Sequence, residues 1–240
     1  MIDFSGIKEL SIGGVKLREL SVGGVKVWQA GRLPAGYTEV EYIHTDGNCY
    51  FDTGVIPSDF PDGIRIDLDF KITQYITDNV YTYYFGCKTS GCYSNCFAVN
   101  SSAGNLRAYV GSSVAYTYKW VAVLNQRTLI SMTSTTEDPH GTMASLKIDG
   151  AEKLVVNTKN NTNPTTMPGV SIHLLNSNGS GRKGVIGECY GSAMFTADGT
   201  PLRKFVPCTN ESGVAGMYDL VSKSFYSNQG TGTLTSGPAV

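Results

Sequence analysis

The sequence predicts an all-β protein: a two-sheet antiparallel jelly-roll sandwich preceded by a short N-terminal β-meander. Of the 240 residues, 16% are charged, 28 are glycine and 14 are tyrosine, a composition far from the Ala, Glu, Lys and Leu enrichment of helical proteins. Apolar and polar residues alternate in several segments, and turn sequences such as Asp-Gly separate these segments. After Gly36, no segment has a sustained helical period.

The chain begins with an internal repeat whose period is ten residues. Residues 8–16 return with conservative changes as residues 18–26, and each copy holds a Gly-Gly pair between short β-branched segments. Such a pair supplies the two positive φ angles of a two-residue hairpin turn, so we predict a three-stranded meander with one apolar face. This meander is too small to bury that face against itself. The face either packs on the following domain or associates with copies of itself, and residues 1–32 are predicted to be a tether or oligomerisation segment.

A connector ending in the turn Pro34-Ala35-Gly36 leads into a single predicted domain, residues 33–240. Its clearest strand is 64–72, where five apolar side chains alternate with charged ones and so lie on one face. Residues 106–110 and 144–148 alternate in the same way, and the turn Asp149-Gly150 follows the second of them. Many short strands with such turns are typical of two packed antiparallel sheets.

Charge and hydropathy exclude several function classes. Lys and Arg total 19 against 20 Asp and Glu, so the net charge is −1 and binding to nucleic acid is not expected. The opening residues 1–4 carry an acidic residue where a signal peptide needs positive charge. The longest apolar run, residues 120–124, is far shorter than the roughly 20 residues of a membrane helix, so we expect no membrane insertion.

Six cysteines leave two alternatives open. At positions 49, 87, 92, 96, 189 and 208, they permit many disulfide pairings, and spacing alone does not choose among them. Cys87, Cys92 and Cys96 lack the C-x2-C spacing of a zinc site and have no nearby histidine. We expect partly buried free thiols, with one or more disulfides as the alternative.

Several motifs carry a resemblance to a known family. They are residues 33–43 and 50–54 near the start of the domain, and 205–208, 213–220 and 230–233 at its end. Together they resemble concanavalin A-like, laminin G-type lectin and glucanase jelly-roll domains of phage virion proteins and gut bacterial surface proteins. The likeness covers residues 33–240 and implies a jelly roll that binds carbohydrate or serves as a virion surface module. The N-terminal repeat likewise resembles segments of phage virion proteins.

Because relatives of this fold include glycoside hydrolases, paired carboxylates need consideration. Asp67 and Asp69 share a strand face, but no third acid stands in register with them, and a solvated outer face is the better interpretation. None of the three histidines, at positions 44, 140 and 173, adjoins a Gly-x-Ser-x-Gly elbow. We therefore expect no enzyme, no catalytic residues and no cofactor. Calcium bound by loop carboxylates such as Asp46 or Asp52 stays open, although no dense acidic loop is present.

Aromatic and polar residues suggest where a sugar binds, because sugar rings stack on aromatic faces while amides and cations hydrogen-bond the hydroxyls. Tyr116, Tyr118 and Trp120 fall on one strand face, which is a stacking platform if it points outward and core if it points inward. Residues 88–95 are expected to form a rim loop beside a strand that carries Arg107 and Tyr109. The candidate carbohydrate-binding residues are Lys88, Tyr93, Asn95, Arg107, Tyr109, Tyr116, Tyr118 and Trp120.

These observations lead to a functional hypothesis: a non-enzymatic phage tail, fibre or head-surface protein whose lectin-like domain recognises host surface carbohydrate. Residues 1–32 would contact other virion proteins and form a homo-oligomer, a trimer by analogy with virion fibres. Alternatives are a purely structural decoration protein, a bacterial adhesin at the cell surface or outside the cell, and a polysaccharide depolymerase.

Overall fold

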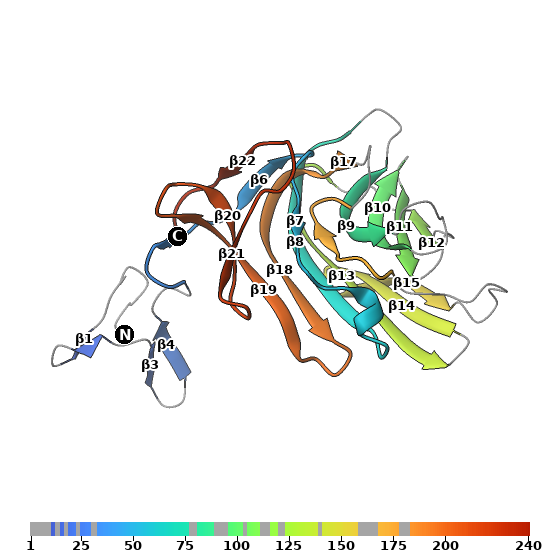
Figure 1. The fold of residues 1–240 in the computed structure, drawn as a ribbon, viewed down its shortest axis with the longest axis horizontal. Coiled ribbons are helices and arrows are strands. Elements are labelled where there is room, and N and C mark those ends of the chain that lie inside the picture. Colours follow the sequence, from blue (N-terminus) through green and yellow to red (C-terminus); the bar gives the residue numbers. More distant parts are fainter. Residues whose placement is uncertain are drawn as a thin grey trace.

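The computed structural model is a sandwich of two β-sheets in which the strands of the smaller sheet lie over β13 to β15 of the larger one (Figure 1). It describes residues 11–12, 15–16, 19–22, 25–29, 33–76, 81–88, 96–102, 105–110, 116–119, 123–138, 141–157, 168–177 and 183–240. Of the side chains, those of 1–32 and of some strand ends lie outside this description. The only helix in the described part is a single 3-10 turn, Pro57–Asp59. The predicted two-sheet antiparallel jelly roll is confirmed.

The larger sheet has eight described strands in one continuous order. Along this order lie β15 (Ala151–Asn157), β14 (Gly141–Ile148), β13 (Arg127–Asp138), β8 (Ile64–Gln74), β18 (Ile186–Thr196), β19 (Pro201–Asn210), β20 (Ala215–Asp219) and β21 (Ser224–Ser227). Three shorter strands join at the side, namely β5 (Tyr37–Glu39) on β19, β6 (Ile43–Asp46) on β18, and β22 (Leu234–Ser236) on β6.

The smaller sheet completes the sandwich. Its order is β12 (Tyr116–Lys119), β11 (Asn105–Val110), β10 (Cys96–Ser102), β9 (Thr82–Lys88), β16 (His173–Leu174) and β7 (Phe51–Asp52). All of these pairs are antiparallel, while β17 (Lys183–Gly184) runs parallel to β9.

Residues 11–29 form two hairpins. β1 (Ser11–Ile12) pairs with β2 (Val15–Lys16), and β3 (Glu19–Val22) pairs with β4 (Val25–Gln29). Each pairing leaves two residues for the turn, as the Gly-Gly pairs predict. Within the described residues β2 does not pair with β3, so the expected three-stranded meander is divided into two local hairpins, and each half of its middle strand pairs with one neighbour only.

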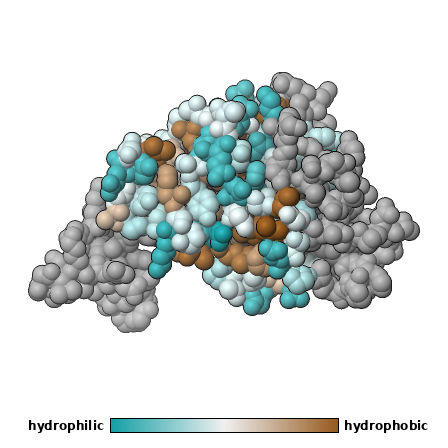
Figure 2. Space-filling view, viewed as in Figure 1, coloured by the Kyte–Doolittle hydropathy of each residue, from teal (hydrophilic) through white to brown (hydrophobic). Residues whose placement is uncertain are grey.

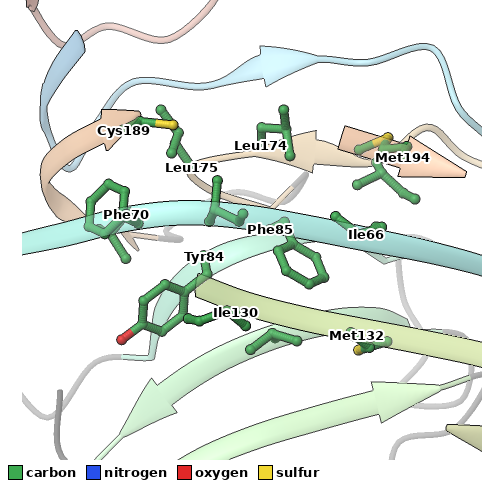
Figure 3. Packing of buried hydrophobic residues seen from close by; sticks show 14 of the residues in the cluster. Ile66, Phe70, Tyr84, Phe85, Ile130, Met132, Leu174, Leu175, Cys189 and Met194 are labelled. Atoms are coloured by element: carbon green, nitrogen blue, oxygen red, sulfur yellow. The ribbon is translucent and has the colours of Figure 1, made fainter. Parts of the chain in front are cut away.

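The core lies between the sheets and confirms the predicted alternation. In β8, Ile64, Ile66, Leu68 and Phe70 are buried while the charged residues between them are half-buried. Figure 3 shows Ile66 and Phe70 near Phe85 and Tyr84 of β9, and Phe70 lies edge-on to Tyr84 with 6.4 Å between the ring centroids. Leu106, Ala108 and Val110 of β11 close the core from the other sheet.

The C-terminal motif fastens the first strands of the domain. A Cβ atom on Gly230 would lie 2.0 Å from the Asn48 carbonyl oxygen, and one on Gly232 would lie 2.1 Å from Asp46 Oδ1, so only glycine permits this approach. Asp46 accepts the backbone N–H groups of Asn48 and Thr233. Near the same end, β22 pairs with β6 and Ala239 forms a bridge with Val40.

Four of the cysteines are buried free thiols, namely Cys49, Cys87, Cys189 and Cys208. Burial raises the pKa of Cys49 to about 11 and the pKa values of Cys189 and Cys208 to about 12, so all three are protonated and unreactive at neutral pH. The expectation of free thiols is confirmed for these four positions. The side chains of Cys92 and Cys96 lie outside the described residues.

Among the residues coloured in Figure 2, hydrophilic and neutral ones cover most of the visible surface, and hydrophobic ones form smaller areas between them. In the described part of the chain, no helix has the length and apolar character needed to cross a bilayer.

Candidate functional site

The outer face of the smaller sheet brings polar and aromatic side chains together. In β11, Leu106, Ala108 and Val110 point into the core, so the alternate residues Arg107 and Tyr109 lie on the opposite face, half-buried. The strand register sets their neighbours, listed by strand: Arg107 lies opposite Asn100 and Tyr109 opposite Ala98 on β10, and Asn100 lies opposite Tyr83 on β9. We call Tyr81, Tyr83, Asn100, Arg107 and Tyr109 the Arg107 face.

Arg107 is held in place by two tyrosines. Its guanidinium carbon lies 5.1 Å from the centroid of the Tyr81 ring, within the range of a cation–π contact. Burial of Arg107 disfavours its charged form, but hydrogen bonds to the side chains of Tyr81 and Tyr109 outweigh this and raise the pKa. The guanidinium is therefore charged and oriented by two tyrosines, and it contacts no carboxylate in the part of the chain that the structure describes.

Two polar groups of this face are buried without partners. Asn100 is 0% exposed, and neither its Oδ1 nor its Nδ2 has a hydrogen-bond partner among the described residues; the same holds for the buried Arg107 Nε. Leaving a buried polar group unsatisfied costs about 1–3 kcal/mol. An ordered water would remove this cost at Asn100, whereas a ligand reaches the more exposed members of the face, namely Tyr81, Arg107 and Tyr109.

Buried apolar side chains lie beside these polar groups. Tyr83 and Ala98, which are 4% and 0% exposed, form a small cluster separate from the main core, and Tyr109 packs against it. Rings next to amide and guanidinium groups are the combination that sugar recognition uses.

The same outer face continues across β9 to a second aromatic pair. Gly86 on β9 lies between Ala98 and His173, and His173 lies opposite Asp52. The His173 ring stacks on Tyr50 with centroids 4.4 Å apart and planes 3° from parallel. Its Nε2 lies 4.0 Å from Asp52 Oδ2, too far for a hydrogen bond, and its Nδ1 is buried without a partner. Burial lowers the pKa of His173, while the nearby Asp52 charge opposes this shift.

Of the predicted sugar-binding residues, the structure brings Arg107 and Tyr109 together, in direct contact. Lys88 ends β9, where it pairs with Cys96, but its side chain lies outside the described residues. Tyr93, Asn95 and Trp120 lie wholly outside them.

The remaining two candidates are on β12. Tyr116 lies opposite Ala108 and Tyr118 opposite Leu106, both of which point into the core. The Tyr118 side chain packs half-buried against the main core cluster. The inward alternative therefore holds for Tyr118, which is not part of an outward stacking platform. The side chain of Tyr116 lies outside the described residues.

Sequence reasoning missed Asn100, Tyr81 and Tyr83. The alternation in β11 identifies the outward face of that strand but does not reveal which residues of β9 and β10 lie opposite. A register shift between Val99 and Asn100 sets this alignment, and no local sequence signal marks it.

The outer face of the larger sheet also gathers aromatic and charged residues, which we call the Tyr190 face. Lys71 Nζ lies 2.5 Å from Glu188 Oε2, and the Tyr190 hydroxyl donates to the same oxygen at 2.6 Å. Arg127 donates to both Asp69 oxygens at 2.8 and 2.7 Å, and its guanidinium carbon lies 3.9 Å from the Tyr190 ring centroid. These charges are all paired, and the predicted outward position of Asp69 is confirmed.

Carboxylates considered for calcium are engaged elsewhere. Asp46 accepts the N–H groups described above, and Asp52 accepts the N–H of Gly54. Among the residues that the structure describes, no three His, Cys, Asp or Glu side chains cluster as metal ligands.

Comparison with known proteins gives a fold but no sequence family. No protein-family model and no curated protein matches the chain. The native heptameric SAP-like pentraxin from Limulus polyphemus is similar with a TM-score of 0.52 at 11% identity, covering 83% of this chain and 96% of the pentraxin. Ruminococcus gnavus IT-sialidase CBM40 gives 0.44 at 13% identity, covering 68% and 91%.

A third solved structure is domain 4 of AbnA, a GH43 extracellular arabinanase from Geobacillus stearothermophilus, in complex with arabinotriose. It gives a TM-score of 0.38 at 22% identity, covering 60% of this chain and 63% of that one. The pentraxin likeness shows the fold alone. The chain has the two-sheet jelly-roll architecture that the sequence resemblance implies, and the lectin family and phage context of that resemblance stay predictions.

Proposed function

We propose that this chain is a non-enzymatic protein of a phage virion surface whose domain 33–240 binds host surface carbohydrate. The observation that supports this most directly is the Arg107 face, where tyrosine rings adjoin an oriented guanidinium and a buried amide with unused hydrogen-bonding capacity. Sugar hydroxyls accept hydrogen bonds, and so they match the N–H donors of the half-buried Arg107 guanidinium.

The absence of catalysis is part of the proposal. Glycosidic hydrolysis needs one carboxyl group that can donate a proton and a second that acts on the sugar or on water. On the Tyr190 face, Arg127 binds Asp69, and Lys71 and Tyr190 bind Glu188, so both carboxylates are engaged in structural contacts. Release of reducing ends from capsular or cell-wall polysaccharide incubated with the protein would contradict this part.

The hairpins of residues 1–32 are proposed to tether the chain to other virion proteins and to form a homo-oligomer, with three copies as the specific expectation. Several copies of a weak site gain avidity of about 10²- to 10⁴-fold without new contacts. Light scattering of the full chain should give a trimer mass, whereas a monomer would contradict this part.

A glycan array probed with the full chain tests carbohydrate binding. Calorimetry with a glycan that binds should then show a loss of about 10-fold or more for Arg107→Ala and for Tyr109→Ala. The matched variants Arg127→Ala and Tyr190→Ala, on the other outer face, should bind as the unchanged protein does. Silence of a folded oligomer across a diverse array would overturn the proposal.

One observation favours a second candidate, a structural decoration protein without glycan binding. Tyr118 packs against the core, so one of the aromatics expected to stack on sugars is used for packing. In that case ordered water would satisfy Asn100, and Arg107→Ala would change no binding property.

A further inference from the structure

We propose that the Arg107 face selects sugars that carry a carboxylate, such as uronic or sialic acids, over neutral sugars. This inference rests on the carbohydrate binding proposed above and names the class of ligand for the same site.

Within the described part of the chain, Arg107 lacks a counter-charge. The structure describes the side chains of four arginines, and three of them pair with aspartate: Arg65 with Asp67, Arg127 with Asp69, and Arg203 with Asp219. Among the described residues Arg107 has no such partner, and its polar contacts are the neutral phenols of Tyr81 and Tyr109. A half-buried cation is normally paired, so an anionic ligand would supply what this site lacks.

The strands of the smaller sheet carry an excess of positive charge. The strands of this sheet carry four cationic side chains against one carboxylate, although the chain as a whole has a net charge of −1. The cations are Lys88, Arg107, Lys119 and Lys183, and the carboxylate is Asp52. An excess of one sign on one sheet attracts ligands of the opposite charge.

The N–H donors of the Arg107 guanidinium have a geometry that suits a carboxylate. Arg107 presents a planar fork of five N–H groups, of which the two tyrosines use only part, since Nε has no partner. Such a fork matches the two oxygens of a planar carboxylate. The exposed Tyr81 and the half-buried Tyr109 lie beside the guanidinium and offer rings on which a sugar can stack. The site therefore offers charge recognition and sugar recognition side by side.

Matched pairs of sugars test this inference by calorimetry at low salt. The probes are trigalacturonate with its carboxyl-reduced galactose trimer, sialyllactose with lactose, and sulfolactose as a sulfated arm. At least one carboxylate sugar should bind about 10-fold or more tightly than its neutral partner. Arg107→Gln should abolish this preference, Arg107→Lys should retain part of it, and Arg127→Gln should leave it unchanged.

The outcomes separate this inference from the proposed function. Equal binding of acidic and neutral partners, array binding confined to neutral glycans, or a preference that survives Arg107→Gln would overturn carboxylate selection and leave glycan binding intact. Binding of sulfolactose without the carboxylate sugars would overturn it as well. If no probe binds and the array is silent, both proposals fail. Thermal unfolding of Arg107→Gln serves as the folding control, because no ion pair is removed and its Tm should stay close to that of the unchanged protein.

Discussion

The two outer faces of the sandwich contain the same kinds of residue but differ in how completely their polar groups are paired. On the Tyr190 face, each charged group meets a partner from an adjacent strand, as Lys71 meets Glu188 and Arg127 meets Asp69. On the Arg107 face, the amide of Asn100 and Nε of Arg107 are buried and unpaired. Paired groups stabilise a fold, whereas unpaired buried groups lower stability unless a ligand satisfies them. The comparison teaches that composition alone does not separate a structural face from a binding face.

Among these substitutions, one that breaks the pairing of the Tyr190 face should lower the stability of the protein the most. Glu188→Ala removes the shared acceptor of Lys71 and Tyr190, so we expect the free energy of unfolding to fall by about 2 kcal/mol. Urea unfolding measures this change. Glu188→Gln keeps an acceptor oxygen and should lose about half as much. An unchanged urea midpoint for Glu188→Ala would show that this pairing adds nothing to stability.

The opposite sign is expected on the Arg107 face. Asn100→Leu replaces an unpaired buried amide with an apolar side chain of similar size, which should raise the free energy of unfolding by about 1 kcal/mol. The matched control is Asn176→Leu, because Asn176 is also buried but its Oδ1 accepts the N–H of Ser177. The control should lose stability. If both variants lose it equally, the Asn100 amide has a partner in solution.

A smaller effect compares two arginines. Arg127→Gln removes a bidentate ion pair with Asp69. Because the Arg127 side chain is 54% exposed, solvent screening limits the expected loss in the free energy of unfolding to about 0.5 kcal/mol. Arg107→Gln removes no ion pair and should lose less. Denaturant midpoints of the two variants, measured side by side, decide this point. A larger loss for Arg107→Gln would mean that its contacts with the tyrosines hold the sheet together.

The smallest expected effect is a pH dependence of the smaller sheet. Burial lowers the pKa of His173 below its usual value of 6.5, so the unfolded chain binds this proton more readily than the folded one. The stability that depends on neutral His173 is present above about pH 6.5 and is lost as the pH falls below it. His173→Gln should reduce the drop in the urea midpoint between neutral and mildly acidic buffer. An identical drop in both proteins would assign the pH dependence to other groups.

Much of the fold could be predicted because it follows from local patterns. The alternation in 64–72 and 106–110 correctly separates the buried from the outward face of β8 and β11, since a strand has a period of two. The pairing of β1 with β2 and of β3 with β4 was predictable because a Gly-Gly pair between two short strands is a local hairpin signal. The lack of pairing between β2 and β3 within the described residues was not predictable, because pairing beyond a single hairpin depends on competition between strands.

The candidate site was predictable only in part. Arg107 and Tyr109 stand two apart on one strand, so their shared face could be inferred from the chain alone. Asn100 and Tyr83 join them through cross-strand register, which includes an irregularity at Val99 and Asn100. The alternation in β12 does not show which of its faces points outward. The alignment of Tyr118 with the buried Leu106 shows that Tyr118 packs inward. Periodicity divides a strand into two faces, but tertiary alignment decides which neighbours each face has.

The pairing of β6 with β22, together with the docking of Gly230 and Gly232 on residues 46–48, has a consequence for synthesis on the ribosome. When residues 33–220 have emerged, one edge of β6 still lacks its hydrogen-bonding partner. The domain therefore completes its fold only after translation has passed Ser236, and a stalled or prematurely released nascent chain would expose an open strand edge to its neighbours.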